Sequence, residues 1–445
     1  MNPVNSRRGF LKTASAATIW SGNTLDAMMQ YTNTASKPSE LKITDLRVAT
    51  ITRAPMTCPI IRIDTNQGIY GLGEVRDGAS KTYALMLKSR ILGENPCSID
   101  KIFRKIKQFG FHARQGGGVS AIEMALWDVA GKAYNVPVYQ MLGGKFRDKI
   151  RCYADTTESD DPKVYGERLK ARKDQGFTWL KMDLGIDLVK NVPGALTFPT
   201  GEDLSMGARK EHMFTGIEIT HKGAEVMANF MAVVREQVGW ETPLSVDHLG
   251  HIGVHSCIRL AKELERYNPA WLEDMIPWQR TEQLKEIKDH IDVPLCTGED
   301  IFLKEPFIDL ARNHSIDIAH PDLATTGGIL ETKKIGDALQ EYGVAMAMHF
   351  AGSPVSCMAN VHCAAATENF LVLENHSVDV PWWSDLVDGV DKPIVNKGFI
   401  AVPEKPGLGI TLNDAVMKQH LLEPGYFEPT PQWDKEQRVN DRLFS

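Results

Sequence analysis

The chain has 445 residues, of which 57 are acidic and 50 are basic, so its formal net charge is −7. A hydrophobic content of 43% with 24% charged residues is typical of a soluble globular protein and argues against a disordered chain. No long basic run and no stretch of eighteen apolar residues occurs, which argues against a nucleic-acid partner and against a membrane span.

The N-terminus carries the pattern of an export signal. Arg7 and Arg8 lie within SRRGFLK, and a small-residue stretch, TASAATIWSG, follows. This pattern is typical of a bacterial twin-arginine signal and predicts a periplasmic protein. The alternative is a chance basic pair in a cytoplasmic protein. Residues 1–40 are therefore the expected signal and linker, and the predicted fold begins at residue 41.

Residues 41–148 are predicted to form an α+β unit. The segments KITDLRVATI, CPIIRIDT and IYGLGEV read as an antiparallel meander with a turn at Asn66-Gln67-Gly68. Further along, VSAIEMALWDVAGKAY has the spacing of a helix with one apolar face.

Residues 149–385 change to short apolar strands alternating with amphipathic helices. Each of the eight predicted strands ends in a polar residue: Asp155, Lys181, Asp247, Glu273, Glu299, Asp322, His349 and Glu374. From Asp247 onward these residues are 26, 26, 23, 27 and 25 positions apart. This is the length of one βα unit, so the pattern predicts an α/β fold with a (β/α)8-type barrel whose strand ends converge on one mouth. An open doubly wound sheet is the competing fold, but no Gly-rich dinucleotide turn is present.

One gap breaks this rhythm. Asp247 follows Lys181 by 66 residues, which is far longer than one βα unit. This spacing predicts a loop insertion of about forty residues after the second strand. Long loops at the catalytic face of a barrel usually shape the substrate cavity.

Three acids at consecutive strand ends, Asp247, Glu273 and Glu299, predict a metal site. Hard oxygen ligands suit Mg²⁺. Unrelated surface acids are the alternative. The nearby His248 and His251 have zinc-like spacing, but the seven cysteines are scattered and none lies beside them, which argues against zinc. The two histidines are expected to be substrate contacts or acid/base groups. The alternative is that they are solvated loop residues.

From residue 41 onward the sequence resembles the enolase superfamily, in its mandelate racemase and muconate lactonizing enzyme branch. The matching pieces are KMD at 181–183, SVD ending at 247, WLED around 273, TGED around 299, HPDLATTGG around 322, MH at 349 and LEN at 374. The resemblance implies a capping domain over the barrel, with residues 386–445 completing both. It also implies one Mg²⁺ and a small carboxylate substrate that loses its α-proton.

The same resemblance implies roles for single residues. Asp322 and His349 match the family's acid/base dyad, and Glu374 matches the acid that hydrogen-bonds the substrate carboxylate. The family often has Lys-x-Lys on the second strand, but here Asp183 stands in place of the second lysine. We expect Asp183 to contact the substrate.

The second acid/base is therefore open. Related galactonate-type dehydratases place a histidine two residues after the third-strand ligand, where this chain has Leu249. Lys181, His248 and His251 are the candidates. Substrate specificity is expected in two cap loops, residues 53–58 and 75–81. Arg53, at the start of the first loop, is a predicted substrate contact.

The predicted activity is Mg²⁺-dependent dehydration of a sugar acid to a 2-keto-3-deoxy acid. An epimerase, racemase or cycloisomerase acting on a hydroxy-carboxylate or lactone is the runner-up, and a non-catalytic sugar-acid binding protein is a further alternative. The family resemblance also predicts a homo-oligomer. The sequence does not identify the sugar acid.

Overall fold

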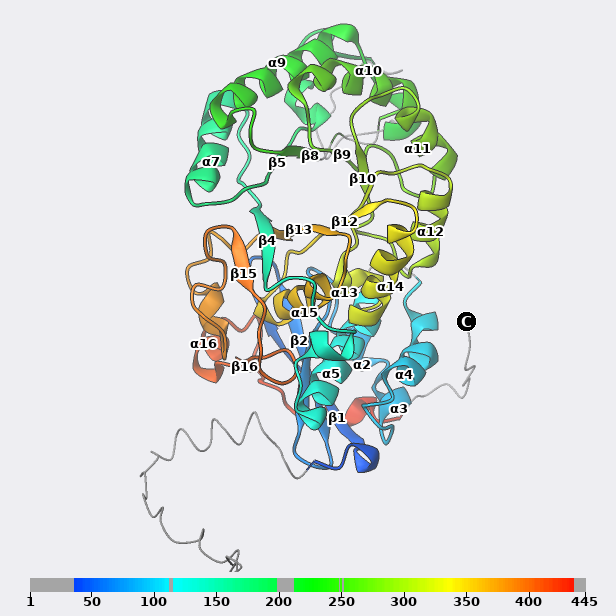
Figure 1. The fold of residues 1–445 in the computed structure, drawn as a ribbon, viewed down its shortest axis with the longest axis vertical. Coiled ribbons are helices and arrows are strands. Elements are labelled where there is room, and N and C mark those ends of the chain that lie inside the picture. The colour runs from blue at the N-terminus through cyan, green and yellow to red at the C-terminus, as the bar shows by residue number, and fades with distance from the viewer. Residues whose placement is uncertain (1–35, 112–114, 198–211, 248, 250–251, 436–445) are drawn as a thin grey trace, which may run out of the picture.

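A computed structural model describes residues 36–111, 115–197, 212–247, 249 and 252–435 (Figure 1). The N-terminal sheet, blue in the figure, lies at one end of the molecule, and an arc of parallel strands with helices on its outer side lies at the other. Within the described ranges, no helix has both the length and the apolar character needed to cross a membrane.

The N-terminal unit is a three-stranded antiparallel sheet packed on one long helix. Its strands are β1 (Ile43–Ile51), β2 (Cys58–Thr65) and β3 (Tyr70–Glu74), paired in chain order. Helix α5 (Gly116–Tyr134) packs against β3. A Cβ atom at Gly71 or Gly73 would lie 2.0 Å from a carbonyl oxygen of α5, so only glycine allows this close approach. The other elements of the unit are α2 (Thr82–Leu85), α3 (Lys88–Ile91), α4 (Ile99–Ile106), α6 (Val138–Met141), η1 (Pro38–Glu40) and η2 (Lys107–Phe109).

All eight predicted barrel strands are present and parallel. They are β4 (Lys149–Ala154), β5 (Leu180–Asp183), β8 (Leu244–Asp247), β9 (Leu272–Glu273), β10 (Leu295–Thr297), β11 (Ile318–Ala319), β12 (Ala345–Met348) and β13 (Phe370–Asn375). Their order in the sheet is β4-β13-β12-β11-β10-β9-β8-β5. At the two ends, β4 and β5 approach within 8 Å between Cα atoms, although in the described part of the chain they share no hydrogen-bond ladder. The sheet is thus strongly curled, and all carboxyl ends point to one mouth.

Helices on the outside of the arc connect these strands. They are α7 (Pro162–Asp174), α9 (His221–Val238), α10 (Val254–Leu264), α11 (Thr281–Lys288), α12 (Glu305–Arg312), α13 (Leu323–Thr326), α14 (Ile329–Gln340) and α15 (Pro354–Ala365), with η5 (Glu265–Tyr267) after α10. Local sequence starts several of them. Asp161 and Ser353 accept hydrogen bonds from the first turns of α7 and α15, and a proline follows each.

The predicted insertion lies between β5 and α9. Its described elements are η4 (Ile186–Val189), β6 (Leu196–Thr197), α8 (Met213–Gly216) and β7 (Glu218–Ile219). Strands β6 and β7 pair antiparallel, so the excursion returns on itself before α9 begins. Residues 198–211 are outside the described ranges, and the predicted role of the insertion in shaping the cavity stays a prediction.

The C-terminal segment joins the two units. Its elements are η6 (Trp383–Leu386), β14 (Val387–Asp388), β15 (Phe399–Ala401), β16 (Thr411–Leu412), α16 (Asp414–Gln419) and η7 (Pro431–Trp433). Strand β15 extends the barrel sheet by pairing antiparallel with β4, whereas Leu421 bridges to Ile51 in β1. The predicted fold class, a barrel with a cap built from both ends of the chain, is confirmed. The boundaries predicted at 148/149 and 385/386 stay predictions.

Candidate active site

Three acidic side chains converge at the barrel mouth. Asp247 and Glu273 are the last residues of β8 and β9, and Glu299 follows the last residue of β10 by two positions. Because these strands are parallel neighbours, their carboxyl ends lie along the same edge. Asp247 and Glu273 are buried, while the side chain of Glu299 is 22% exposed. The predicted trio is therefore brought together.

A fourth carboxylate, Asp274, lies among them. One oxygen from each of Glu273, Asp274 and Glu299 lies within 4.8 Å of the others. Burial, followed by the charges of Glu273, Glu299 and Asp247, raises the pKa of Asp274 well above its usual range. Such crowding of like charges in a buried place is relieved by a cation, and an all-oxygen donor set is the kind that Mg²⁺ prefers. The residues present thus fit the expected metal.

Lys181 places a positive charge beside these acids. Its Nζ lies 2.7 Å from Asp247 Oδ2, 3.1 Å from Glu374 Oε1 and 3.3 Å from Glu273 Oε1. Burial alone would lower the pKa of Lys181, but the three carboxylates raise it well above its usual range. The ammonium group is thus held in its charged form, and in this arrangement it is a partner for carboxylates rather than a free base.

The predicted dyad is in place. Asp322 and His349 form a backbone bridge after β11 and β12, and His349 Nδ1 lies 2.6 Å from Asp322 Oδ2. Arg76, from the cap, places Nη1 3.0 Å from the same Asp322 oxygen. Burial would raise the pKa of Asp322, yet Arg76 and His349 keep it below its usual range. Asp322 is therefore an ionised carboxylate that orients the imidazole.

The other ring nitrogen of His349 faces the acids of the mouth. Its Nε2 lies 3.4 Å from Glu299 Oε2 and 3.7 Å from Glu374 Oε2. Burial and the charge of Arg76 lower the pKa of His349. Glu299, Glu374 and Asp322 outweigh them and raise this pKa to about 9. The imidazole can thus hold or release a proton at Nε2 while Nδ1 stays on Asp322.

Glu374 is the centre of a network that also contains two further histidines. His320 is fully buried, with Nδ1 2.7 Å from Glu273 Oε1 and Nε2 3.1 Å from the hydroxyl of Tyr153. His376 lies with Nε2 3.2 Å from Glu374 Oε1. Burial would raise the pKa of Glu374, but Lys181, His349 and His376 lower it well below its usual range.

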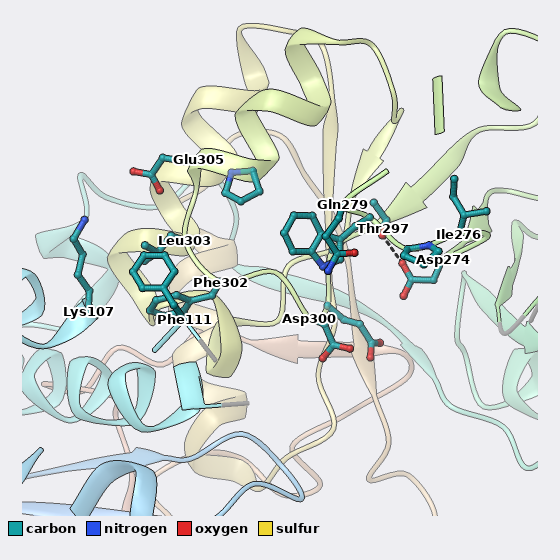
Figure 2. Close-up of a pocket in the computed structure, with 15 residues that line it drawn as sticks. Lys107, Phe111, Asp274, Ile276, Gln279, Thr297, Asp300, Phe302, Leu303 and Glu305 are labelled. Atoms are coloured by element: carbon teal, nitrogen blue, oxygen red, sulfur yellow. Dashed lines mark hydrogen bonds between the residues drawn. The ribbon is translucent and has the colours of Figure 1, made fainter. Parts of the chain in front are cut away.

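A cavity of about 840 Å³ opens beside the carboxylates (Figure 2). Asp274, Glu299 and Asp300 line it on the barrel side. Phe111 and Phe302 form its other end, with ring centroids 5.3 Å apart in an edge-to-face contact. The cavity therefore offers a small molecule an acidic end and an aromatic end.

Four further predicted site residues remain to be placed. His248 and His251 lie outside the described residues. Asp183 ends β5 opposite Asp247 in the ladder, and its backbone N–H donates to the Tyr165 hydroxyl. Arg53 has a left-handed φ of 57° and forms no hydrogen bond or ion pair with another described residue. The expected substrate contacts of Asp183 and Arg53 stay predictions.

Sequence reasoning missed Arg76, His320 and His376. A partial signal existed for each. Arg76 lies in the cap loop expected to set specificity, and His320 and His376 lie two residues from the predicted Asp322 and Glu374. At the carboxyl end of a strand, a residue two positions away can reach the same mouth.

Two family models cover most of the chain. The N-terminal domain model of mandelate racemase / muconate lactonizing enzyme matches residues 31–143, and the enolase C-terminal domain-like model matches residues 165–416. The second match alone covers more than half of the chain.

Curated relatives agree with these matches. D-xylonate dehydratase from Haloferax volcanii is 33% identical over 405 residues, covering 89% of this chain and 92% of the relative. D-galactonate dehydratase from Ralstonia pickettii is 27% identical over 397 residues, covering 86% of this chain and 95% of the relative.

Solved structures show the same fold. A mandelate racemase/muconate lactonizing enzyme-like protein from Rubrobacter xylanophilus superposes with a TM-score of 0.76 at 28% identity, covering 87% of this chain and 99% of the other. The corresponding enzyme from Jannaschia sp. gives a TM-score of 0.72 at 30% identity over 86% and 99%. The chain is thus an enzyme of the enolase superfamily, in its mandelate racemase and muconate lactonizing enzyme branch.

Proposed function

We propose that the protein is a Mg²⁺-dependent hydro-lyase that dehydrates a sugar acid to a 2-keto-3-deoxy acid. The observation that carries this proposal is the His349–Asp322 pair, in which Nδ1 lies 2.6 Å from the carboxylate and Nε2 lies 3.4 Å from Glu299 in the carboxylate cluster. The dehydratase names of the relatives, which cover nearly the whole chain, support the hydro-lyase class.

The metal would be held by Asp247, Glu273 and Glu299. When bound, Mg²⁺ supplies positive charge that stabilises the negative charge developing on the substrate carboxylate as its α-proton leaves. Such a proton is too weakly acidic for a side-chain base acting alone. The crowding of these acids around Asp274 is the structural feature that favours a divalent ion here.

The protein's own residues then move protons. His349 has Nδ1 fixed on Asp322, so Nε2 is the nitrogen that can take the α-proton when the ring is neutral. Glu299, the charge that most raises the pKa of this ring, is one of the residues that would hold the metal. Arg76 keeps Asp322 ionised, and Asp322 in turn stabilises the imidazolium that forms. Glu374, near His349 Nε2, lies where it can contact the substrate carboxylate.

Dehydration is balanced by two proton transfers. The base takes the proton from the α-carbon, the bond between the β-carbon and its hydroxyl breaks, and an acid gives one proton to the departing hydroxyl to form water. The enol that remains tautomerises to the 2-keto acid. No oxidant or reductant is needed.

A panel of sugar acids with and without Mg²⁺ tests the proposal. The purified full chain should convert at least one aldonic acid, with D-xylonate and D-galactonate as first probes, to a product lighter by one water that reacts as a 2-keto-3-deoxy acid. Chelation should abolish the reaction and Mg²⁺ should restore it. A product of unchanged mass would show an isomerase, and binding without turnover across the panel would show a sugar-acid binding protein.

We also propose export by the twin-arginine route, which rests on SRRGFLK at residues 6–12. These residues lie outside those that the structure describes. Changing both Arg7 and Arg8 to Lys should keep the protein in the cytoplasm of its native host. Cell fractionation measures this, and unchanged distribution between the compartments would refute export by this route.

A further inference from the structure

A second histidine–aspartate pair lies at the mouth, beside the first. His376 follows the end of β13 and Asp155 follows the end of β4, and these strands are hydrogen-bonded neighbours. The backbone N–H of Asp155 donates to Asn375 O at 2.9 Å, which places the two residues together. His376 Nδ1 lies 3.3 Å from Asp155 Oδ2.

The new pair has the same construction as the His349–Asp322 pair. In both, the two residues follow adjacent parallel strands, and Nδ1 of the histidine faces the aspartate. The rings of His349 and His376 are 6.1 Å apart between centroids. One nitrogen of each and one oxygen of Glu374 lie within 4.8 Å of one another. Two proton-carrying nitrogens are thus close enough to serve adjacent carbons of one substrate.

The outer nitrogen of His376 is available to a ligand. Nε2 is buried and forms an ion pair with Glu374 Oε1 at 3.2 Å, but this contact does not have the geometry of a hydrogen bond. A buried polar atom without a hydrogen bond is uncommon in a folded protein and is typical of sites that bind a polar ligand. Lys181 differs, since three carboxylates surround its ammonium group.

We propose that His376, oriented by Asp155, is the second acid/base of this active site and donates the proton to the departing β-hydroxyl group. This role rests on the proposed dehydratase function. It assigns the second acid/base, whose identity the sequence left open because the second lysine of the family pattern is absent. His349 Nε2 takes the α-proton, the C–O bond at the β-carbon breaks, and His376 Nε2 gives its proton to the hydroxyl, so that one water leaves.

The surroundings of His376 suit a proton donor. Burial lowers the pKa of His376, but Asp155 and Glu374 raise it to about 10, so the ring is charged at neutral pH. The charged groups that face it are Asp155 and Glu374, with Lys181 and His349 behind Glu374. The Asp155 side chain is 43% exposed and that of His376 is 16% exposed, so this pair can recover its proton from solvent. Because both imidazoles approach from adjacent strand ends, the elimination should be syn.

A leaving-group substitution separates proton donation from a structural role. The variant His376→Asn should lose at least about a hundredfold in kcat for water elimination, the smallest effect usual for a lost general acid. It should still exchange the substrate α-proton with deuterated solvent, because His349 is intact. Fluoride leaves without needing a proton, so the 3-deoxy-3-fluoro analogue of the substrate should be turned over at a rate close to wild type.

Three variants make this test specific. Asp155→Asn should show the same pattern in weaker form, and His349→Asn should not be rescued by fluoride because the α-proton stays in place. The control His314→Asn makes the same change at an exposed position with a left-handed φ of 54°, which asparagine tolerates, and should act like wild type.

Two results would overturn the proposal. One is water elimination by His376→Asn within threefold of wild type. The other is equal loss of water and fluoride elimination, which would show a structural role. If wild type dehydrates no sugar acid, the proposed function fails, but the pair can still be tested. NMR titration of His376 should then show a lower pKa in Asp155→Asn, and an unchanged pKa would overturn the pairing.

Discussion

Buried carboxylates occur in two parts of this molecule, and their surroundings differ. At the barrel mouth, Glu273 and Glu374 face ionisable side chains, namely Lys181 and the imidazoles of His320, His349 and His376. At the junction between cap and barrel, Glu74 and Glu123 face mainly backbone N–H groups. All four carboxylates are at most 1% exposed.

The junction acids cap barrel helices from the other domain. Glu74, at the end of β3, accepts hydrogen bonds from the N–H groups of Ser353 at 3.0 Å and Ser356 at 3.3 Å, where α15 begins. Glu123, in α5, accepts from Ile329 N at 2.6 Å and Leu330 N at 3.0 Å, where α14 begins. A negative side chain suits a helix N-terminus, whose first N–H groups lack intrahelical partners.

Similar buried carboxylates thus serve different ends because their neighbours differ. A carboxylate held by backbone N–H groups can satisfy them only by keeping its position, so it joins two units. A carboxylate surrounded by amines and imidazoles has neighbours that can exchange protons and a cation. Changes at the mouth should therefore affect metal binding and turnover with little effect on folding, and changes at the junction should do the reverse.

The largest effect is expected from Glu273→Gln. This change keeps the size of the side chain and an oxygen for the Trp271 Nε1 hydrogen bond, but removes a charge from the predicted ligand set. Loss of a residue that only hydrogen-bonds a metal ligand typically lowers metal affinity by roughly 10- to 100-fold. Because Glu273 is a predicted ligand itself, the loss of Mg²⁺ affinity should be larger. Calorimetric Mg²⁺ titration measures this loss, with the change Glu282→Gln at an exposed position of α11 as control. Metal binding and turnover equal to wild type would remove Glu273 from the ligand set.

His349→Asn should come next. Asparagine is polar and of similar size but cannot carry a proton, so kcat should fall at least about a hundredfold, which is about 2.7 kcal/mol in activation free energy. Exchange of the substrate α-proton with deuterated solvent should fall as well, while Mg²⁺ binding and thermal unfolding stay close to wild type. Exchange and elimination at wild-type rates would refute the dyad, and exchange without elimination would make His349 the acid.

Most of the mouth could be predicted from the sequence because a barrel repeats one unit. Equal spacing of Asp247, Glu273 and Glu299 already implies that they share an edge, and the structure places them there. The same spacing predicted that Asp322 and His349 lie at the carboxyl ends of consecutive strands. The family resemblance added the roles, which spacing alone does not supply.

The junction could not be predicted in this way. Its partners come from segments that are far apart in the chain, such as Glu74 with Ser353 and Glu123 with Ile329. Nothing in the local sequence of either acid indicates the helix end it caps, since the docking of cap on barrel decides it. Arg76 escaped prediction for the same reason, because its partner Asp322 lies on the barrel.

Glu74→Ala tests the structural side of the comparison. It leaves the Ser353 and Ser356 N–H groups buried without their acceptor, and each such group costs about 1–3 kcal/mol. We expect the free energy of unfolding to fall by about 3–5 kcal/mol, with KM and the pH profile of the remaining native protein unchanged. Denaturant unfolding measures the loss, and Glu40→Ala on the exposed surface should change stability by less than about 0.5 kcal/mol. A loss below about 1 kcal/mol would contradict a joining role.

The smallest effect, and the one that depends on pH, is expected at Glu123. Burial is the main cause that raises the pKa of Glu123 from 4.5 to about 7, although the N–H groups of Leu330 and Ile329 oppose it. The native protein therefore holds this proton more tightly than the unfolded chain does. The stabilisation is complete below about pH 4.5 and declines as the pH rises through 7, by at most about 3 kcal/mol.

Glu123→Gln should remove this decline. The amide is neutral at every pH and its oxygen can still accept a hydrogen bond at the start of α14. The difference between the unfolding free energies of variant and wild type should then shift in favour of the variant by up to about 3 kcal/mol between pH 5 and pH 8. Urea unfolding at several pH values measures this difference, and the exposed control Glu282→Gln should show almost none. If the difference is constant with pH, Glu123 is already ionised throughout the range, and its N–H partners outweigh its burial.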